Sequence, residues 1–350
     1  HELMHVIQQG KQTHDPCMIH RFKDEYHEKI IKSGLKGTAM EDTWREVYFG
    51  SWLRDFSQLI GSDSDPLFKE VVIHVLNRMA QEKFGLKVDE KRLGYYRAQE
   101  HMDNPSVTPP ATEKPIDTSV SYIKKELKLS VQSGPNTDGR IHFGQALHAA
   151  QDFFSQTSFV RDAIQMCKNP GVKPEQLVTG AFGAKDKEVS ILELLVNFVK
   201  SKMSEVSLTP AENLRQFIGR VMPLPAESRI PDVYYMDPRE IPEDKIWVEA
   251  LAVLEPKLEQ ARKEAKALVP VPTHSALHQD DPNRPLYKIA YILAEFVTNK
   301  LAISMDLAWS GESTQNLEKM NIFIHKYLQG PEKGEWWRGV LEGKGMLECR

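Results

Sequence analysis

The sequence predicts an all-α protein, and two observations carry that prediction. Apolar residues recur at positions i, i+3, i+4 and i+7 through most of the chain, which is the spacing of a helix with one buried face. Strict alternation of polar and apolar residues over the length of a strand is nearly absent. The best strand candidate, residues 232–236 ("DVYYM"), is short. We therefore expect helices packed on one another with no substantial sheet.

The predicted helices follow one another along the chain and share this apolar periodicity. One of them also carries a start signal, because Thr209 suits an N-cap position and Pro210 suits the first helical position. The predicted helices cover residues 27–35, 65–85, 139–164, 191–203, 207–219, 247–269 and 285–309.

Two proline-rich stretches separate groups of predicted helices. Residues 102–118 hold four prolines and residues 222–244 hold more, and proline blocks helix and favours extended or turn backbone. Neither stretch has the Gly/Ser composition of a flexible linker. We therefore expect one large helical domain crossed by long proline-rich loops.

Composition narrows the class of protein. The 350 residues are 41% hydrophobic and 27% charged, which is typical of a globular chain and not of a disordered one. The net charge of -4 argues against a dedicated nucleic-acid binder, which would normally be basic. No uninterrupted apolar run approaches the roughly 18 residues that a membrane-spanning helix needs. The odd number of scattered cysteines (Cys17, Cys167 and Cys349) predicts reduced thiols and no zinc finger.

The segment "ALHAAQDFF" places two polar residues within an apolar helix. His148 and Asp152 are four residues apart, so they lie on the same face of the helix. A buried carboxylate without a partner costs several kcal/mol, so Asp152 needs a counter-charge or a metal ion. One interpretation is a core histidine hydrogen-bonded to its own aspartate, and the other is a pair of metal ligands.

Further histidines and aspartates could join this pair, although each has an ordinary interpretation. His27 could be a solvated residue at a helix start, Asp55 could pair with Arg54, and Asp280 could cap the helix that begins near Pro285. Taken together, these residues offer oxygen and imidazole ligands without sulfur, which suits Zn²⁺ in a hydrolase, or Mn²⁺ or Ca²⁺ where carboxylates dominate. The candidate metal ligands are His27, Asp55, His101, His148, Asp152, His274 and Asp280.

Four motifs resemble, in order, those of the HET-C family. They are "VYFGSWLRDFSQ", "KRLGYYRAQEHMDNP", "GRIHFGQALHAAQDFFSQTSF" and "PTHSALHQDDPNRPL", and they span roughly residues 42–300. The family is named for a fungal heterokaryon-incompatibility protein and also occurs as bacterial toxin domains. It is distantly similar to zinc-dependent phospholipase C and to single-strand-specific zinc nucleases, which are all-α enzymes holding up to three zinc ions in a cleft.

The resemblance implies a role for each candidate ligand. His27 matches an early histidine, Asp55 and His101 match the next two ligands together with His148, and Asp152 matches an aspartate that bridges two metals. His274 with Asp280 or Asp281 matches a late pair of ligands. We expect Asp55 and Asp152 to be catalytic as well, because clustered metals polarise a phosphoryl oxygen and activate water. The candidates for a second shell or weak ligation are Gln156, His142, Arg54 and Asp281.

Gln156 departs from the resemblance. Relatives commonly carry a histidine at this position, one turn after the bridging aspartate. A glutamine amide oxygen is a weak ligand for zinc and an acceptable one for calcium. We therefore expect a divalent metal, with zinc as the first choice and calcium or manganese as alternatives, and one site of a three-metal centre weakened or differently loaded.

The first residues carry a second resemblance. "HELMHVIQQG" contains His1, Glu2 and His5 in the HExxH pattern of zinc proteases. It is similar to the end of a zincin-like leader found on effectors of extracellular contractile injection systems, although a plain amphipathic helix is the alternative. We expect residues 1–20 to be the stub of such a leader and residues 21–350 to be the HET-C-like domain.

These expectations combine into one functional hypothesis. The chain would be a metal-dependent phosphodiester hydrolase of phospholipase C type, an injected or secreted toxin acting on phospholipids at the target-cell membrane. Its partners would be the membrane surface, an immunity protein and a contractile or type VI-like delivery apparatus, with no nucleic acid. The alternatives are a phospholipase cleaving acyl esters, a metal-dependent nuclease, and a non-catalytic incompatibility or interaction protein with a structural metal.

Overall fold

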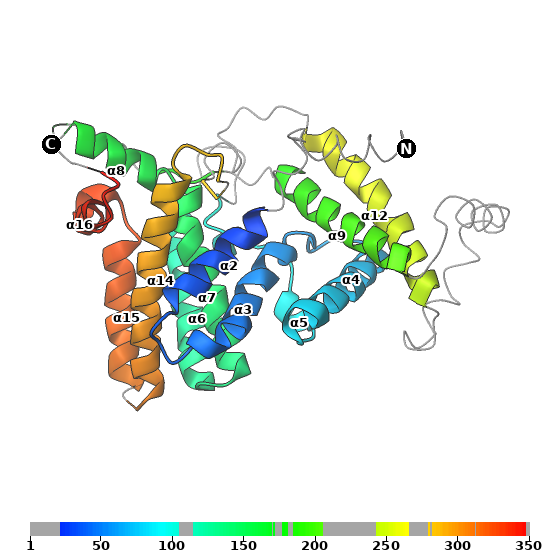
Figure 1. Cartoon of the computed structure of the whole chain (residues 1–350), viewed down its shortest axis with the longest axis horizontal. Helices are drawn as coiled ribbons and strands as arrows, with labels where there is room; N and C mark the ends of the chain where they lie inside the picture. Colours follow the sequence, from blue (N-terminus) through cyan, green and yellow to red (C-terminus); the bar gives the residue numbers. More distant parts are fainter. Residues whose placement is uncertain are drawn as a thin grey trace, which may run out of the picture. The chain divides into compact units, whose positions relative to one another are not determined.

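The computed structural model describes most of the chain, and most of the described residues are helical. It describes residues 22–104, 115–169, 171, 177–180, 185–205, 243–265, 279–280, 282–311 and 313–347. Within these ranges there is no β-strand, and β-type pairing is limited to isolated bridge residues such as Thr157 and Thr179, which pair with each other. The prediction of an all-α protein is therefore confirmed (Figure 1). The strand candidate at residues 232–236 and the helix expected at 207–219 lie outside the described residues.

The described residues form two compact units. The first unit draws on His1–Asp55, Arg97–Gly183 and Pro270–Arg350, and the second on Phe56–Tyr96 and Ala184–Val269. The helices of the first unit are α2 (Phe22–Gly34), η2 (Glu41–Thr43), α3 (Trp44–Ser57), η3 (Ala98–Glu100), α6 (Pro115–Ser133), α7 (Thr137–Gln156), α8 (Phe159–Lys168), α14 (Tyr287–Trp309), α15 (Ser313–Tyr327), η5 (Pro331–Lys333) and α16 (Trp336–Gly343), with the last two residues of α3 in the second unit. Those of the second unit are α4 (Pro66–Phe84), α5 (Glu90–Leu93), α9 (Lys185–Glu205) and α12 (Glu243–Ala265).

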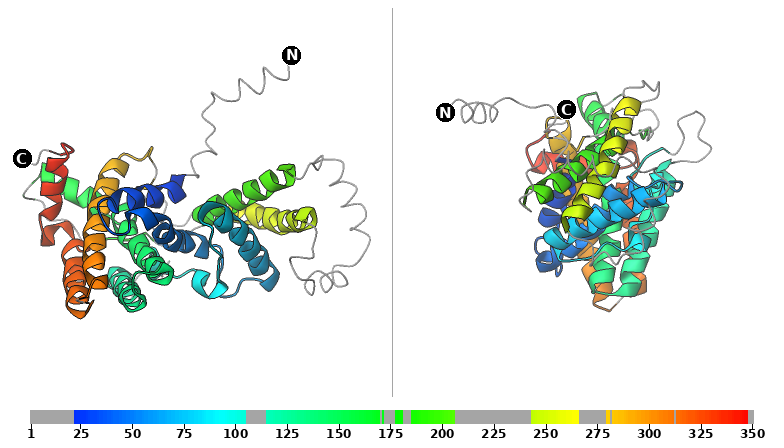
Figure 2. Two further views of the ribbon diagram at one scale, coloured as in Figure 1. Left: turned by 60° about the horizontal axis from the view of Figure 1, so that its bottom comes forward. Right: turned by 90° about the vertical axis from the view of Figure 1, so that its right-hand side faces the viewer.

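Helix α7 is the centre of the first unit. It packs against α6 and α14, and α14 in turn packs against α2, α15 and α16 (Figures 1 and 2). Every residue of α7 from Phe143 to Gln156 is buried, which is unusual for a helix with this many polar side chains. The polar residues of α7 therefore face other protein groups and not solvent.

In the second unit, α12 packs against α9 and α4 through an ordinary apolar face. The buried residues of α12 include Trp247, Leu254 and Leu258, while its charged residues lie at the surface. Arg262 of α12, for example, forms an ion pair of 2.7 Å with Glu193 of α9. This amphipathic pattern is the one that the sequence periodicity predicts.

Local signals explain where the helices begin and end. Asp65 accepts a hydrogen bond from the backbone N–H of Phe68, Pro66 takes the first helical position, and Gly85 ends α4 in the left-handed conformation. The helix predicted at residues 139–164 divides into α7 and α8. Thr157 between them is extended, and its hydroxyl donates to the backbone carbonyl of Phe153.

The structure also bears on the predicted thiols, on membrane-spanning helices and on the proline-rich loops. Cys167 on α8 is disulfide-bonded, so the prediction of reduced thiols was wrong for this residue; cysteine count and scatter do not reveal which positions the fold brings together. Among the described residues, no helix is long and apolar enough to span a membrane. Of the expected proline-rich loops, residues 105–114 and 222–242 lie outside the described residues.

Candidate metal centre

Helix α7 supplies the first two residues of the centre. Nε2 of His148 lies 3.1 Å from Oδ2 of Asp152, and both side chains are completely buried. The i, i+4 spacing therefore places the two side chains on one face of the helix, as the sequence predicted. Taken alone, this contact also fits a core histidine paired with its own aspartate, so the surrounding residues decide the interpretation.

Two glycines let α3 approach the backbone of α7. A Cβ atom at Gly50 would lie 2.1 Å from the backbone oxygen of Ile141, and one at Gly144 would lie 1.8 Å from the backbone oxygen of Val47. Both distances are far below a van der Waals contact, so only glycine fits at either position. The missing side chains bring the two helix backbones close together near the middle of α7.

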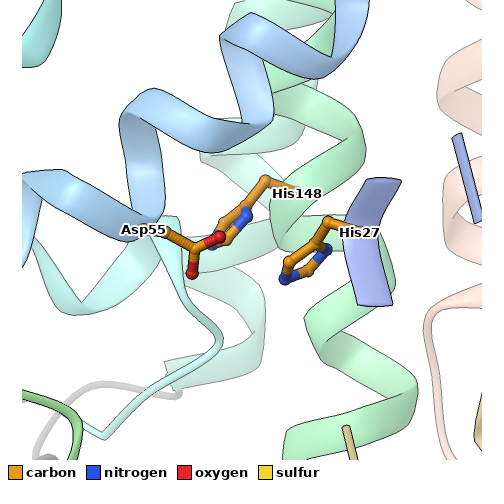
Figure 3. A group of neighbouring side chains, drawn as sticks. All are labelled: His27, Asp55 and His148. Atoms are coloured by element: carbon orange, nitrogen blue, oxygen red, sulfur yellow. The ribbon is translucent and has the colours of Figure 1, made fainter. Parts of the chain in front are cut away.

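The close approach carries two residues of α3 into the centre. Oγ of Ser51 lies 3.2 Å from Nδ1 of His148. Asp55 follows one turn later, and its side chain points toward His148 (Figure 3). The contact with Ser51 occupies Nδ1 of His148 and leaves Nε2 of the same ring facing Asp152, where a metal ion would bind.

Helix α2 supplies His27. Nε2 of His27 lies 3.4 Å from Oδ1 of Asp152, and its Nδ1 lies 2.7 Å from Oε1 of Gln151. The amide of Gln151 also lies 3.0 Å from the hydroxyl of Thr298 on α14. His27 and His148 face one another, with ring centroids 4.3 Å apart (Figure 3). A hydrogen-bond partner on the outer ring nitrogen is the usual support of a metal-binding histidine.

His101 enters from the end of the short helix η3. Its Nδ1 lies 3.0 Å from Nε2 of His148 and 3.8 Å from Oδ2 of Asp152. The following residue, Met102, has a φ of 53°, the only positive φ at a non-glycine residue in the described part of the chain. A buried residue in the left-handed region is strained, and such strain persists only where the surroundings hold the backbone.

These side chains satisfy the distance requirement of a metal site. Two ligands of one tetrahedral zinc ion are about 3.4 Å apart when each bond to the metal is about 2.1 Å long. The ligand atoms of His101, His148 and Asp152 are separated by 3.0, 3.1 and 3.8 Å. These three residues form one group that could hold an ion, and His27, Asp55 and His148 form a second. The donor set, imidazole with carboxylate, suits zinc.

Burial and charge set the protonation of the cluster. Burial alone would lower the pKa of His27, but the hydrogen bond to Asp152 and the charge of Asp55 outweigh it and raise the pKa to about 9. Burial lowers the pKa of His148 more than Asp152 raises it, which favours the neutral ring that metals bind. Burial would raise the pKa of Asp152, yet His148 and His27 hold it well below its usual range. The carboxylate is therefore ionised and ready to bind a cation.

One end of the cluster holds the residue that departs from the HET-C pattern. The amide of Gln156 donates to Oδ1 of Asp152 at 3.0 Å, and its own Oε1 is buried without a hydrogen-bond partner. Gln156 is thus part of the centre. Asp280 is buried nearby, where burial and its charge raise the pKa of Tyr26. Asp280 belongs to neither group of ligand atoms in the described residues.

Two other candidates pair with carboxylates beside the cluster. Arg54 forms an ion pair of 2.6 Å with Glu100, and both side chains are buried. His142 contacts Glu126 at 2.7 Å and is partly exposed. Neither Arg54 nor His142 contributes to a ligand group.

The remaining candidates lie outside the described residues. They are His274 and Asp281 of the late ligand pair, and His1, Glu2 and His5 of the leader.

Sequence reasoning missed several residues that support the ligands. Ser51 was detectable in principle, because it is four residues before Asp55 on the same helix face. Gln151 adjoins Asp152, and Thr298 interrupts an apolar helical stretch, so each is a polar residue in an apolar context. Their partners, however, are 97, 124 and 147 residues distant in sequence, and no local pattern identifies them.

Comparison with known families adds to this geometry. The family model of the heterokaryon incompatibility protein Het-C matches residues 23–114. Over this segment the chain is similar to the Het-C family. The comparisons with curated proteins and with solved structures gave no match.

The Het-C segment carries three of the five clustered residues, His27, Asp55 and His101. Helix α7, with His148 and Asp152, follows this segment in sequence and packs beside it. The family resemblance inferred from the sequence motifs is confirmed by this match. The similarity to phospholipase C and the zincin-like leader stay predictions.

Proposed function

We propose that the chain is a divalent-metal-dependent hydrolase whose metal is held by the buried cluster on α2, α3, η3 and α7. The observation that carries this proposal is the mutual spacing of His101, His148 and Asp152, at 3.0 to 3.8 Å. Three unlinked segments of chain converge on one ionised carboxylate, and a core histidine paired with its own aspartate would need only α7.

The residues of the chain have distinct roles in this proposal. Asp152 offers one oxygen toward His27 and the other toward His148 and His101, which suits a carboxylate shared between two ions. Asp55 adds a second negative charge to offset the cations. Ser51 and Gln151 orient the imidazole rings of His148 and His27. A bound divalent ion would supply Lewis-acid activation of a phosphoryl group and of water.

For the substrate class we propose phosphodiesters of phospholipids. Its support is the resemblance of the sequence motifs to the Het-C family, for which we expect a distant similarity to zinc-dependent phospholipase C. The net charge of -4 disfavours a nuclease, because nucleic-acid binding relies on neutralising phosphates with Lys and Arg. A role as a delivered membrane toxin, with an immunity partner and an injection apparatus, belongs to this proposal and rests on the resemblances alone.

One observation favours a second candidate, a non-catalytic protein with a structural metal. The five clustered side chains are nearly inaccessible, with His27 at 1% and Asp55 at 4% exposure and the other three at 0%. Structural zinc sites are closed in this way, whereas catalytic sites keep an open position for substrate. Hydrolysis would therefore require the centre to open to a lipid head group.

Metal analysis combined with a lipid assay separates the candidates. Protein purified without chelator is analysed for bound elements and is then incubated with phosphatidylcholine vesicles, with release of the phosphorylated head group measured. Bound zinc with head-group release supports the hydrolase. Bound zinc with no release of head group or fatty acid, and with no cleavage of single-stranded DNA, supports the structural metal. Absence of any bound divalent metal contradicts both candidates.

A further inference from the structure

A buried ion pair joins the two segments that carry Asp55 and His101. Nη1 of Arg54 lies 2.6 Å from Oε2 of Glu100, and the two side chains are only 6% and 3% exposed. Each partner directly precedes a residue of the cluster, Arg54 before Asp55 on α3 and Glu100 before His101 at the end of η3. The pair therefore links these two short pieces of backbone from 46 residues apart in sequence.

Stability alone is a poor reason for such a pair. Taking both charges out of water costs much of what their attraction returns, and apolar residues of similar volume often stabilise a core equally well. A buried ion pair is better suited to fixing a geometry, since its direction and separation are specific.

The backbone close to Glu100 is strained, so the surrounding residues must hold it in one conformation. Met102 has a φ of 53° and is completely buried, directly after His101. A non-glycine residue keeps this strained conformation only where its neighbours oppose relaxation. The Arg54–Glu100 pair anchors the same turn on the other side of His101.

We propose that Arg54 and Glu100 are positioning residues, which hold Asp55 and His101 at the separation that the metal centre requires without touching the metal. The part of this inference that concerns metal affinity rests on the proposed function. The part that concerns the position of His101 does not, because it is about the contact of 3.0 Å between His101 and His148, which can be measured in chelator.

The test replaces the pair by apolar residues in Arg54→Met/Glu100→Leu. The control is Arg140→Met/Glu46→Leu, which removes a less buried Arg–Glu pair of 3.0 Å between α7 and α3 that adjoins no cluster residue. Thermal unfolding of both variants is followed in chelator. The ring-nitrogen NMR signals of His101 and His148 are recorded in chelator with ¹⁵N-histidine, and zinc affinity is measured by competition with a chromophoric chelator.

We expect both double variants to unfold near the wild-type temperature. In Arg54→Met/Glu100→Leu, the ring signals of His101 and His148 shift and zinc affinity falls by about 10-fold or more. In the control variant, the ring signals and the zinc affinity stay at wild-type values. Unchanged ring signals and affinity in the Arg54 variant would overturn the inference, as would equal changes in the control.

Two further outcomes are also decisive. If the apolar double variant does not fold, Arg54→Lys replaces it, because lysine keeps the charge but loses the fork of the guanidinium. Shifted ring signals in Arg54→Lys support the positioning role, and wild-type signals overturn it. If the wild-type protein binds no divalent metal, the proposed function fails, and the NMR signals recorded in chelator still decide whether the pair positions His101.

Discussion

Helices α7 and α12 are of similar length and differ in what they bury. α12 buries apolar side chains along one stripe and leaves its charges to solvent, as the sequence periodicity predicts. α7 is buried on nearly all sides and carries its polar residues into the core. The polar residues that α7 buries in or beside the cluster are His148, Gln151, Asp152, Ser155 and Gln156.

The comparison separates the apolar contacts that stabilise the fold from the polar cluster that we propose binds metal. Apolar burial along α12 contributes roughly 25 cal/mol per Å² of surface removed from water. Burial of a carboxylate such as Asp152 costs free energy unless partners compensate it. Each prediction below changes one of these two helices, with one control in α16, and asks whether stability or metal chemistry responds.

The largest effect is expected at Asp152. Asp152→Ala removes the carboxylate that both ligand groups adjoin, so zinc affinity should fall by more than about 100-fold and head-group release should stop. The helical circular dichroism signal should stay close to wild type, because the apolar neighbours in α7 are unchanged. His148→Ala should likewise lower zinc affinity and stop head-group release while keeping the helical signal. Activity that survives in the double variant Asp152→Ala/His148→Ala would refute a metal mechanism at this site.

Leu254 on α12 should show the opposite pattern. Leu254→Ala leaves a cavity in the fully buried face of α12 and should lower the free energy of unfolding by about 2–5 kcal/mol. Zinc bound per folded molecule should stay unchanged. Chemical denaturation and elemental analysis of the same preparation check the two halves of this prediction, and loss of zinc from the folded variant would contradict it.

A substitution at Gly144 should lower both the stability of the fold and the affinity for zinc. In Gly144→Ala the added methyl group would meet the backbone oxygen of Val47, so α3 must move away from α7. We expect a loss of about 1–3 kcal/mol in unfolding free energy together with weaker zinc binding, because Asp55 moves with α3.

Gly339→Ala is the control for this change. Gly339 lies in α16, with no atom near the position of an added Cβ. Alanine there should leave zinc binding unchanged and raise the free energy of unfolding by up to about 1 kcal/mol. Equal zinc affinity in the two alanine variants would show that the contact of α3 with α7 does not position the ligands.

The smallest expected change concerns Gln156. Gln156→His replaces a weak amide ligand by an imidazole next to Asp152, so the zinc content should rise. The wild-type protein should correspondingly hold fewer tightly bound ions than a three-zinc enzyme. Elemental analysis of both proteins decides the matter, and equal zinc content would mean that Gln156 serves only as a hydrogen-bond donor to Asp152.

The sequence by itself determined the helical class and the contact between His148 and Asp152. Both follow from local periodicity, because apolar spacing marks a buried helix face and residues four apart share that face. The helix expected at residues 65–85 from the same periodicity is observed as α4 (Pro66–Phe84). The sequence did not place the break between α7 and α8, since the polar stretch around Thr157 continues the helical pattern acceptably.

Only the tertiary structure decided which residues meet at Asp152. His27 and His101 reach it from two other segments, and Asp55 on α3 joins His27 and His148 beside it. Helix periodicity specifies a face but not the partner that covers it. The crossing of two helices depends on the shape of both surfaces at once, and no single segment of the sequence contains that information.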